Sequence, residues 1–166
     1  MDLEERVADL ERRMAALERP EPAAVTHSTG DFWALEGLKA QLAELGAADG
    51  GVLFTGAVRL PTGQRYEWQT GAVAEDLFER DWSLAADSFA ALGHPVRLRL
   101  LREILGGRCT AAELAGLEET GTTGQIYHHL RQLTGAGWLH TTGRGRYEVP
   151  AGRVVPLLVV LSAARP

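Results

Sequence analysis

The chain has a single cysteine, Cys109, among its 166 residues, so no disulfide can form within it. A lone thiol fits the reducing cytoplasm better than a secreted, disulfide-stabilised domain. The longest apolar run, Val154–Ala164, is too short to cross a bilayer, and the first twenty residues are too charged for a secretory signal. We therefore expect a cytoplasmic protein without a membrane-spanning segment.

Motifs for catalysis or for holding a cofactor are also missing from the sequence. The run Gly121–Gln125 (GTTGQ) lacks the lysine and the preceding strand of a phosphate-binding loop, and no nucleophile elbow is present. His128 and His129 are neighbours on a predicted helix and point about 100° apart, so they cannot easily share one metal ion. We expect neither an enzyme nor a cofactor or metal site.

Charge is distributed unevenly along the chain. The net charge is −5, which by itself argues against a nucleic-acid partner. Residues 93–166, however, hold nine arginines and lysines against five acids, and four of the five histidines also lie there. An acidic first half and a basic second half indicate a nucleic-acid surface in the second half.

Two short helices are predicted within the basic half. Thr110 is a suitable N-cap for a helix over Ala111–Gly116, and Thr122 or Thr123 for a second helix over Gly124–Leu133. In the second helix Ile126, Leu130 and Leu133 share one face by their spacing and predict a buried stripe. The opposite face carries Gln125, Tyr127, His128 and Arg131.

A predicted hairpin follows, with strands over Trp138–Thr142 and Arg146–Val149 and a tight turn that contains Arg144. A polar helix face beside a basic hairpin suits the major groove of DNA and its flanking phosphates. The residues that we expect to contact DNA are Thr122, Thr123, Gly124, Gln125, Tyr127, His128, Arg131, Arg144 and Arg146.

Several of these runs resemble the ArsR-type winged helix-turn-helix family of bacterial transcription regulators. They are Ser88–Leu105 (SFAALGHPVRLRLLREIL), Thr110–Ala115 (TAAELA), Gly121–Leu139 (GTTGQIYHHLRQLTGAGWL) and Arg144–Val149 (RGRYEV). The resemblance covers roughly the C-terminal half and implies a homodimeric DNA-binding protein. It also implies that the terminal helix contributes Leu158 and Leu161 to the dimer interface. Metal-sensing members often carry Cys-x-Cys where this chain has Cys109 alone, so the resemblance does not extend to metal sensing.

The N-terminal half departs from that family. Leu3, Val7, Leu10, Met14 and Leu17 recur at spacings of 4, 3, 4 and 3, which predicts a short dimeric coiled coil over 1–19. The alternative is an amphipathic helix that packs on its own domain or frays in solvent. A proline-containing linker is expected over 20–30, and residues 31–74 form an extension that serves dimerisation or effector binding. The winged helix-turn-helix domain is expected over 75–166.

The extension is predicted to contain a helix over Phe32–Leu45 and a β-hairpin over Val52–Leu60 and Gln64–Gln69. A lone hairpin is unstable in water, so it must pack on something or pair with a second copy. Its aromatic side chains either fill a core or interface, or surround a small-molecule effector near Trp33, Phe54, Tyr66 and Trp68.

Three further helices are expected, over Glu75–Ala91, Val96–Leu105 and Arg153–Ala164, the last interrupted early by Pro156. The sequence thus predicts a mainly α fold with small β content (α+β), in which an N-terminal helix, a second helix and a β-hairpin precede a winged helix-turn-helix. We expect a homodimeric transcriptional regulator that binds double-stranded DNA. The alternative is a protein-interaction module that docks on another regulator without specific DNA binding.

Overall fold

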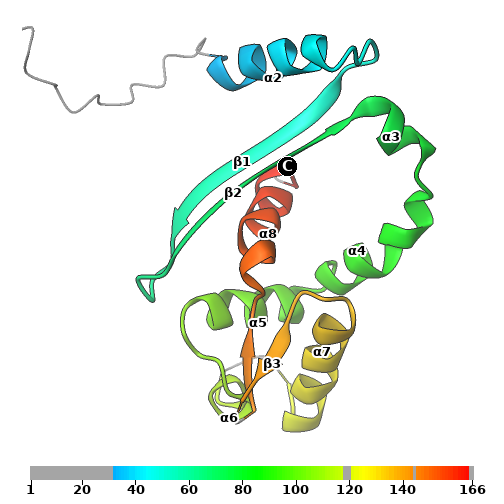
Figure 1. Ribbon diagram of the computed structural model, residues 1–166. Helices are drawn as coiled ribbons and strands as arrows, with labels where there is room; N and C mark the ends of the chain where they lie inside the picture. Colours follow the sequence, from blue (N-terminus) through cyan, green and yellow to red (C-terminus); the bar gives the residue numbers. More distant parts are fainter. Residues whose placement is uncertain (1–31, 118–120, 144, 165–166) are drawn as a thin grey trace, which may run out of the picture. The chain divides into compact units, whose positions relative to one another are not determined.

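The computed structural model describes residues 32–117, 121–143 and 145–164. The chain divides after Gly37 into two units, and apart from Phe32 and the start of helix α2 (Trp33–Glu44) all described residues belong to the second. The described elements are mainly helical with two small antiparallel hairpins, which confirms the predicted α+β class at that level (Figure 1). The coiled coil expected from Leu3, Val7, Leu10, Met14 and Leu17 lies outside the described residues.

The first hairpin consists of β1 (Gly51–Arg59) and β2 (Arg65–Val73), paired in register from Gly51 opposite Val73 to Arg59 opposite Arg65. The predicted turn around Pro61–Gly63 is confirmed: Gly63 has a φ of 86°, and its N–H donates to the Leu60 carbonyl at 2.8 Å. The second strand runs further than expected because Thr70–Val73 continues the ladder opposite Gly51–Phe54.

Helix α8 (Ala151–Ala163) packs on one face of this hairpin (Figure 1). Gly56 lies so close to Val155 that an added Cβ would be 2.6 Å from the valine Cγ1 atom. Gly152 similarly leaves room for the Trp68 ring, whose nearest atom would be 3.4 Å from an added Cβ. Val155 is therefore buried against the chain's own hairpin.

Helix α8 begins earlier than expected and contains Pro156 without being interrupted. Leu158 is half-buried, whereas Leu161 is exposed. Both line a groove of about 610 Å³ together with Leu98, Leu101 and Leu105 of α5 (Pro95–Leu105). The predicted dimer contact through Leu158 and Leu161 stays a prediction, because the structure holds a single chain.

The predicted helix over Glu75–Ala91 is wrong. The structure has α3 (Ala74–Glu79), a 3₁₀ turn η1 (Trp82–Ala85) and α4 (Ala86–Leu92) instead. The break follows from Asp81, whose carboxylate accepts a hydrogen bond from the Ser83 N–H at 2.9 Å and so replaces a helical partner. Hydrogen bonds from Ser83 lower the pKa of Asp81.

The apolar residues of this segment are also not buried as a stripe. Phe78 is 75% exposed, Leu84 83% and Phe89 63%, and the Trp82 indole touches Phe78 with ring centroids 6.1 Å apart. The break turns successive side chains away from one common face. Apolar residues at helical spacing therefore form no single buried stripe over 75–91. Helix α2 has no buried residue either, although Leu42 lies against Gly51 of the hairpin.

The core lies among α4, α5, α6 (Ala111–Ala115), α7 (Thr123–Gly135) and α8. Leu100 of α5, Leu114 of α6 and Leu130 of α7 have no exposed surface. Trp138 closes one side, where its indole N–H donates to the Ser88 hydroxyl at 3.0 Å and the Arg153 guanidinium lies 4.9 Å from its ring. Among the described residues every helix is too short or too polar to span a bilayer.

Replacing Gly56 with alanine should weaken the contact between the hairpin and α8. The added methyl overlaps Val155, so we expect the free energy of unfolding to fall by about 1–3 kcal/mol in a urea titration, as for other overpacked cores. Gly135→Ala is the control, because nothing lies within 4 Å of a Cβ at that helical position. Equal stability of the Gly56 variant and wild type would contradict this packing.

Candidate nucleic-acid interface

Helix α7 is the element that carries most of the predicted DNA contacts. Ile126, Leu130 and Leu133 are fully buried, as their spacing predicts. On the other side Tyr127 is 46% exposed, and His128 and Arg131 are exposed as well. The buried stripe therefore fixes the rotation of α7 about its axis and directs a hydroxyl, an imidazole and a guanidinium to solvent.

The N-terminus of α7 is closed by a reciprocal pair of hydrogen bonds. The Thr122 hydroxyl accepts from the Gln125 N–H at 3.4 Å, and the Gln125 side-chain carbonyl accepts from the Thr122 N–H at 2.7 Å. This pair is a capping box, in which each residue satisfies a donor that the helix itself leaves unpaired. Thr122 is thus the cap, and Thr123 and Gly124 are exposed residues of the first turn.

Gly121 is required by the same arrangement. Its φ is 90°, in the left-handed region that side chains rarely adopt. A Cβ at this position would also lie only 2.4 Å from the Gln125 Oε1 atom. The Gln125 side-chain oxygen already serves the cap, and the predicted contact of Gln125 with DNA stays a prediction.

Arg97 holds α7 against the neighbouring helices, a role that the sequence did not indicate. Its guanidinium donates to the carbonyls of Ala90 and Ala91 at the end of α4, each at 2.6 Å, and to the Gln132 side-chain oxygen on α7. Three acceptors on two helices suit the fixed fork of an arginine. His94 caps α5, the helix that carries Arg97, since its Nδ1 accepts from the Val96 N–H at 3.2 Å.

A second hairpin lies beside α7 in the chain, formed by β3 (His140–Thr142) and β4 (Arg146–Glu148). Both strands are shorter than predicted, because Trp138 and Leu139 are buried in the core before pairing begins. Arg144, in the turn, lies outside the described residues.

The loop before α6 anchors this hairpin. The Tyr147 N–H donates to the Cys109 carbonyl at 2.7 Å, and the exposed Arg146 donates to the Cys109 sulfur. Arg146 lies next to the turn of the hairpin, opposite Thr142, and its guanidinium is partly used in the contact with Cys109.

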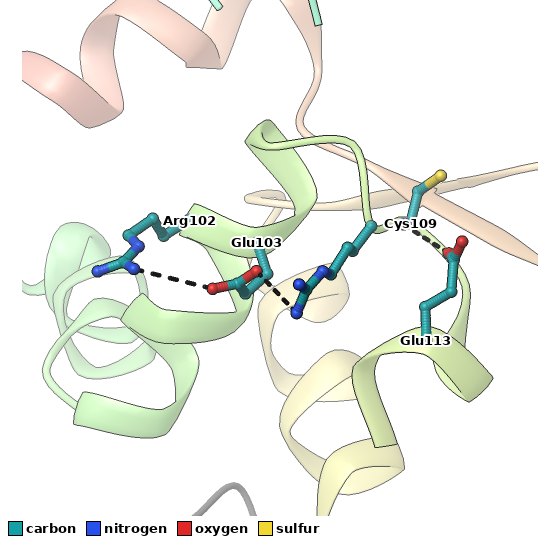
Figure 2. Close-up of polar contacts among 5 residues, drawn as sticks. Arg102, Glu103, Cys109 and Glu113 are labelled. Carbon is teal, nitrogen blue, oxygen red and sulfur yellow. Dashed lines mark hydrogen bonds and ion pairs between the residues drawn. The ribbon is translucent and has the colours of Figure 1, made fainter. Parts of the chain in front are cut away.

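Carboxylates stabilise the same loop. Glu113 accepts from the backbone N–H groups of Cys109 and Thr110 at 3.1 and 2.9 Å, completing a capping box on α6, while Glu103 pairs with Arg102 and Arg108 (Figure 2). Hydrogen bonds from Thr110 lower the pKa of Glu113. The cap at Thr110 confirms the sequence prediction. The reciprocal hydrogen bond from the Thr110 N–H to the Glu113 carboxylate was not predicted. A threonine followed three residues later by a glutamate is nevertheless the sequence signature of a capping box.

Three of the four aromatic residues proposed to surround an effector, Phe54, Tyr66 and Trp68, lie on the β1–β2 hairpin. Trp68 rests on Gly152, Tyr66 lines a cavity of about 310 Å³ near Cys109, and Phe54 is half-buried elsewhere on β1. Trp33 lies in the other unit of the chain, so an effector near these residues stays a prediction. Within the described part of the chain, no three His, Cys, Asp or Glu side chains group closely enough to hold a metal ion.

His129 lies on the inner side of α7, next to His94, with ring centroids 4.6 Å apart. Its Nδ1 atom is buried and has no hydrogen-bond partner among the described residues. Burial lowers the pKa of His129, and the nearby His94, Arg97 and His128 lower it further. The His129 side chain is half-buried.

No family model, no curated protein and no solved structure matches the chain.

The stability of the fold should depend on pH through His129. A histidine whose pKa is lowered on folding binds fewer protons in the folded than in the unfolded state. The stability that neutral His129 contributes is therefore fully present above the unfolded-state pKa of about 6.5. It is lost as the pH falls below that value. His129→Phe should flatten the decline in melting temperature between pH 7.5 and pH 5.5, whereas His140→Gln, an exposed site, should not. An unchanged decline in the His129 variant would contradict this assignment.

Gln125→Ala should cost about 1 kcal/mol of unfolding free energy, because it removes half of the capping box. Gln125→Glu should retain the stability, since a glutamate accepts the same Thr122 N–H and favours a helix N-terminus. Urea titrations of both variants test this. Equal stability of the alanine variant and wild type would show that Gln125 is not needed for the cap.

Proposed function

We propose that the protein is a homodimeric transcriptional regulator that binds double-stranded DNA in the cytoplasm. In this proposal the region from α4 to α8 is a winged helix-turn-helix of the ArsR type, α6 and α7 are its helix-turn-helix, and the β3–β4 hairpin is its wing. The main observation in support of the proposal is that one side of α7 is apolar and buried and the other is polar and exposed. Its apolar stripe is fully buried while Tyr127, His128 and Arg131 point outward.

The N-terminus of α7 supports this assignment. The exposed Thr123 and Gly124 lie in the first turn of a thirteen-residue helix, where unpaired N–H groups and the helix dipole favour phosphate. Arg131 lies two turns further along the same helix and supplies the cation that a phosphate or guanine needs. Together these groups would place the first turn of α7 at the DNA backbone and its middle in the major groove.

Homodimerisation would present two copies of α7 to one duplex. A two-fold axis predicts a near-palindromic operator with half-sites about 10 bp apart, or a multiple of that spacing. The positive balance of residues 93–166 would favour association with DNA, while the acidic first half would face away from it.

A second candidate function is that of a protein-interaction module that docks on another regulator. It is favoured by the exposed apolar side chains between β2 and α5, namely Phe78, Trp82, Leu84 and Phe89. Exposed groups of large apolar side chains often mark protein interfaces. This function predicts a protein that shows no sequence preference in DNA binding.

Selection from a random-sequence duplex library, followed by fluorescence-anisotropy titrations at several salt concentrations, tests the proposal. A near-palindromic consensus and a steep salt dependence are expected. Recovery of no consensus would favour the protein-interaction function instead.

Arg131→Ala should weaken binding to the selected duplex about tenfold and reduce the salt slope by about 1, because one cation at the DNA surface is lost. Gln125→Glu should also weaken binding, since it adds a negative charge to the DNA-facing side while keeping the cap. Arg65→Ala on β2 removes an equal charge far along the chain and serves as the control. Equal loss in all three variants would point to net charge alone rather than to α7.

A further inference from the structure

The β1–β2 hairpin has two edges whose backbone groups point outward. The Leu60 N–H donates to the Gln64 carbonyl and the Ala74 N–H to the Gly50 carbonyl, both at 2.9 Å, on either side of the ladder. Because hydrogen-bonded and non-bonded pairs alternate in an antiparallel ladder, the even-numbered residues bond across the hairpin. The odd-numbered residues therefore direct their N–H and C=O groups away from it. These are Leu53, Thr55 and Ala57 on β1, and Glu67, Gln69 and Gly71 on β2.

Neither edge is covered by a further strand among the described residues, since this sheet has two strands only. One face of the hairpin is already covered by α8. A nine-residue strand with open backbone groups is a template for pairing with another chain. The edges are thus surfaces that the hairpin offers to another strand.

The two edges differ in charge. Residues 51–58 of β1 (GVLFTGAV) carry no charged side chain, whereas β2 has Arg65 and Glu67 within its first three residues. Proteins commonly protect an exposed edge with charged residues, so β2 resembles a protected edge and β1 does not. An exposed, uncharged strand edge tends to pair with another chain unless it is already paired.

We infer that β1 pairs antiparallel with β1 of a second copy of this chain, giving a four-stranded sheet in the order β2–β1–β1–β2. Pairing about Thr55 brings Leu53 of one copy opposite Ala57 of the other, and the small side chains at positions 55 and 57 allow close approach. It also brings Arg59 at the end of one strand opposite Gly51 of the second copy, next to that copy's Asp49. Two such opposite-charge neighbours, one at each end, favour this arrangement over a parallel one.

This interface is separate from the groove between α5 and α8, and it does not depend on DNA binding. It gives the hairpin the additional strands that a stable sheet in water requires.

Amide hydrogen exchange on the full chain tests the inference directly. The N–H groups of Leu53, Thr55 and Ala57 should exchange slowly, while those of Glu67, Gln69 and Gly71 should exchange as unbonded amides. The β2 amides are an internal control, because they occupy the equivalent positions on the opposite edge. Fast exchange on both edges would overturn the inference, and protection of β2 alone would overturn the choice of edge.

Proline substitutions then test the effect on assembly. Thr55→Pro removes only an outward N–H, so it leaves the ladder of the hairpin intact. It should raise the dimer dissociation constant about thirtyfold, because each copy loses one hydrogen bond at the two-fold axis. Gln69→Pro makes the same change at the paired position on β2 and should leave the dimer unchanged. Circular dichroism and melting curves establish that both variants are folded.

Analytical ultracentrifugation of these variants and of Leu161→Glu identifies the contact. Weakened association of the Thr55 variant, with intact dimers of the other two, would support the β1 edge. Dimers that persist in Thr55→Pro and dissociate in Leu161→Glu would place the contact at the α5–α8 groove and overturn the inference. A monomeric wild type would overturn the inference and the homodimeric part of the proposed function, whereas the DNA titrations test α7 separately.

Discussion

The burial of one side of α7 is the constraint on which the rest of the structure depends. Ile126, Leu130 and Leu133 have no exposed surface, so α7 cannot rotate without exposing three large apolar side chains. Each would lose about 1.5–3 kcal/mol of transfer free energy on exposure, which makes the rotation of this helix well determined. Arg97 also links α4 to α7, because its guanidinium donates hydrogen bonds to the Ala90 carbonyl and to the Gln132 side-chain oxygen. The outward direction of Tyr127, His128 and Arg131 is a consequence of this packing.

The hairpin extension is joined to the helical core by the contact between Gly56 and Val155. The same helix, α8, packs on the core through Val154 and Leu157 and on the hairpin through Val155. The family resemblance implies that this terminal helix contributes to a dimer interface. In the structure it also packs on the chain's own hairpin. Among the described residues, Leu161 and the hairpin edges stay open to a second copy.

Much of the helical half could be predicted from the sequence, because its signals are local. The spacing of Ile126, Leu130 and Leu133 gave the buried face of α7, and the caps at Thr110 and Thr122 follow from residue type and position. The turn at Gly63 could likewise be predicted from the sequence. These features depend on contacts within a few residues, which a sequence displays directly.

Other features could not be predicted because they depend on competition or on distant contacts. Helical spacing over 75–91 was overridden by the hydrogen bond between Asp81 and Ser83. Gln125 has the residue type of a base-reading side chain, yet its carbonyl serves the cap. Arg97 and Ser88 act through partners that lie far along the chain, Gln132 and Trp138. Winged-helix identity and DNA recognition remain proposals that depend on the outer face of α7.

The most direct test of that face is to follow backbone amide signals by NMR while a duplex carrying the selected consensus is added. The account predicts that the signals of Thr123, Gly124, His128 and Arg131 shift strongly, while those of the β1–β2 hairpin and of Leu161 stay in place. Shifts confined to the hairpin or to the exposed segment around Trp82, with α7 unchanged, would contradict it.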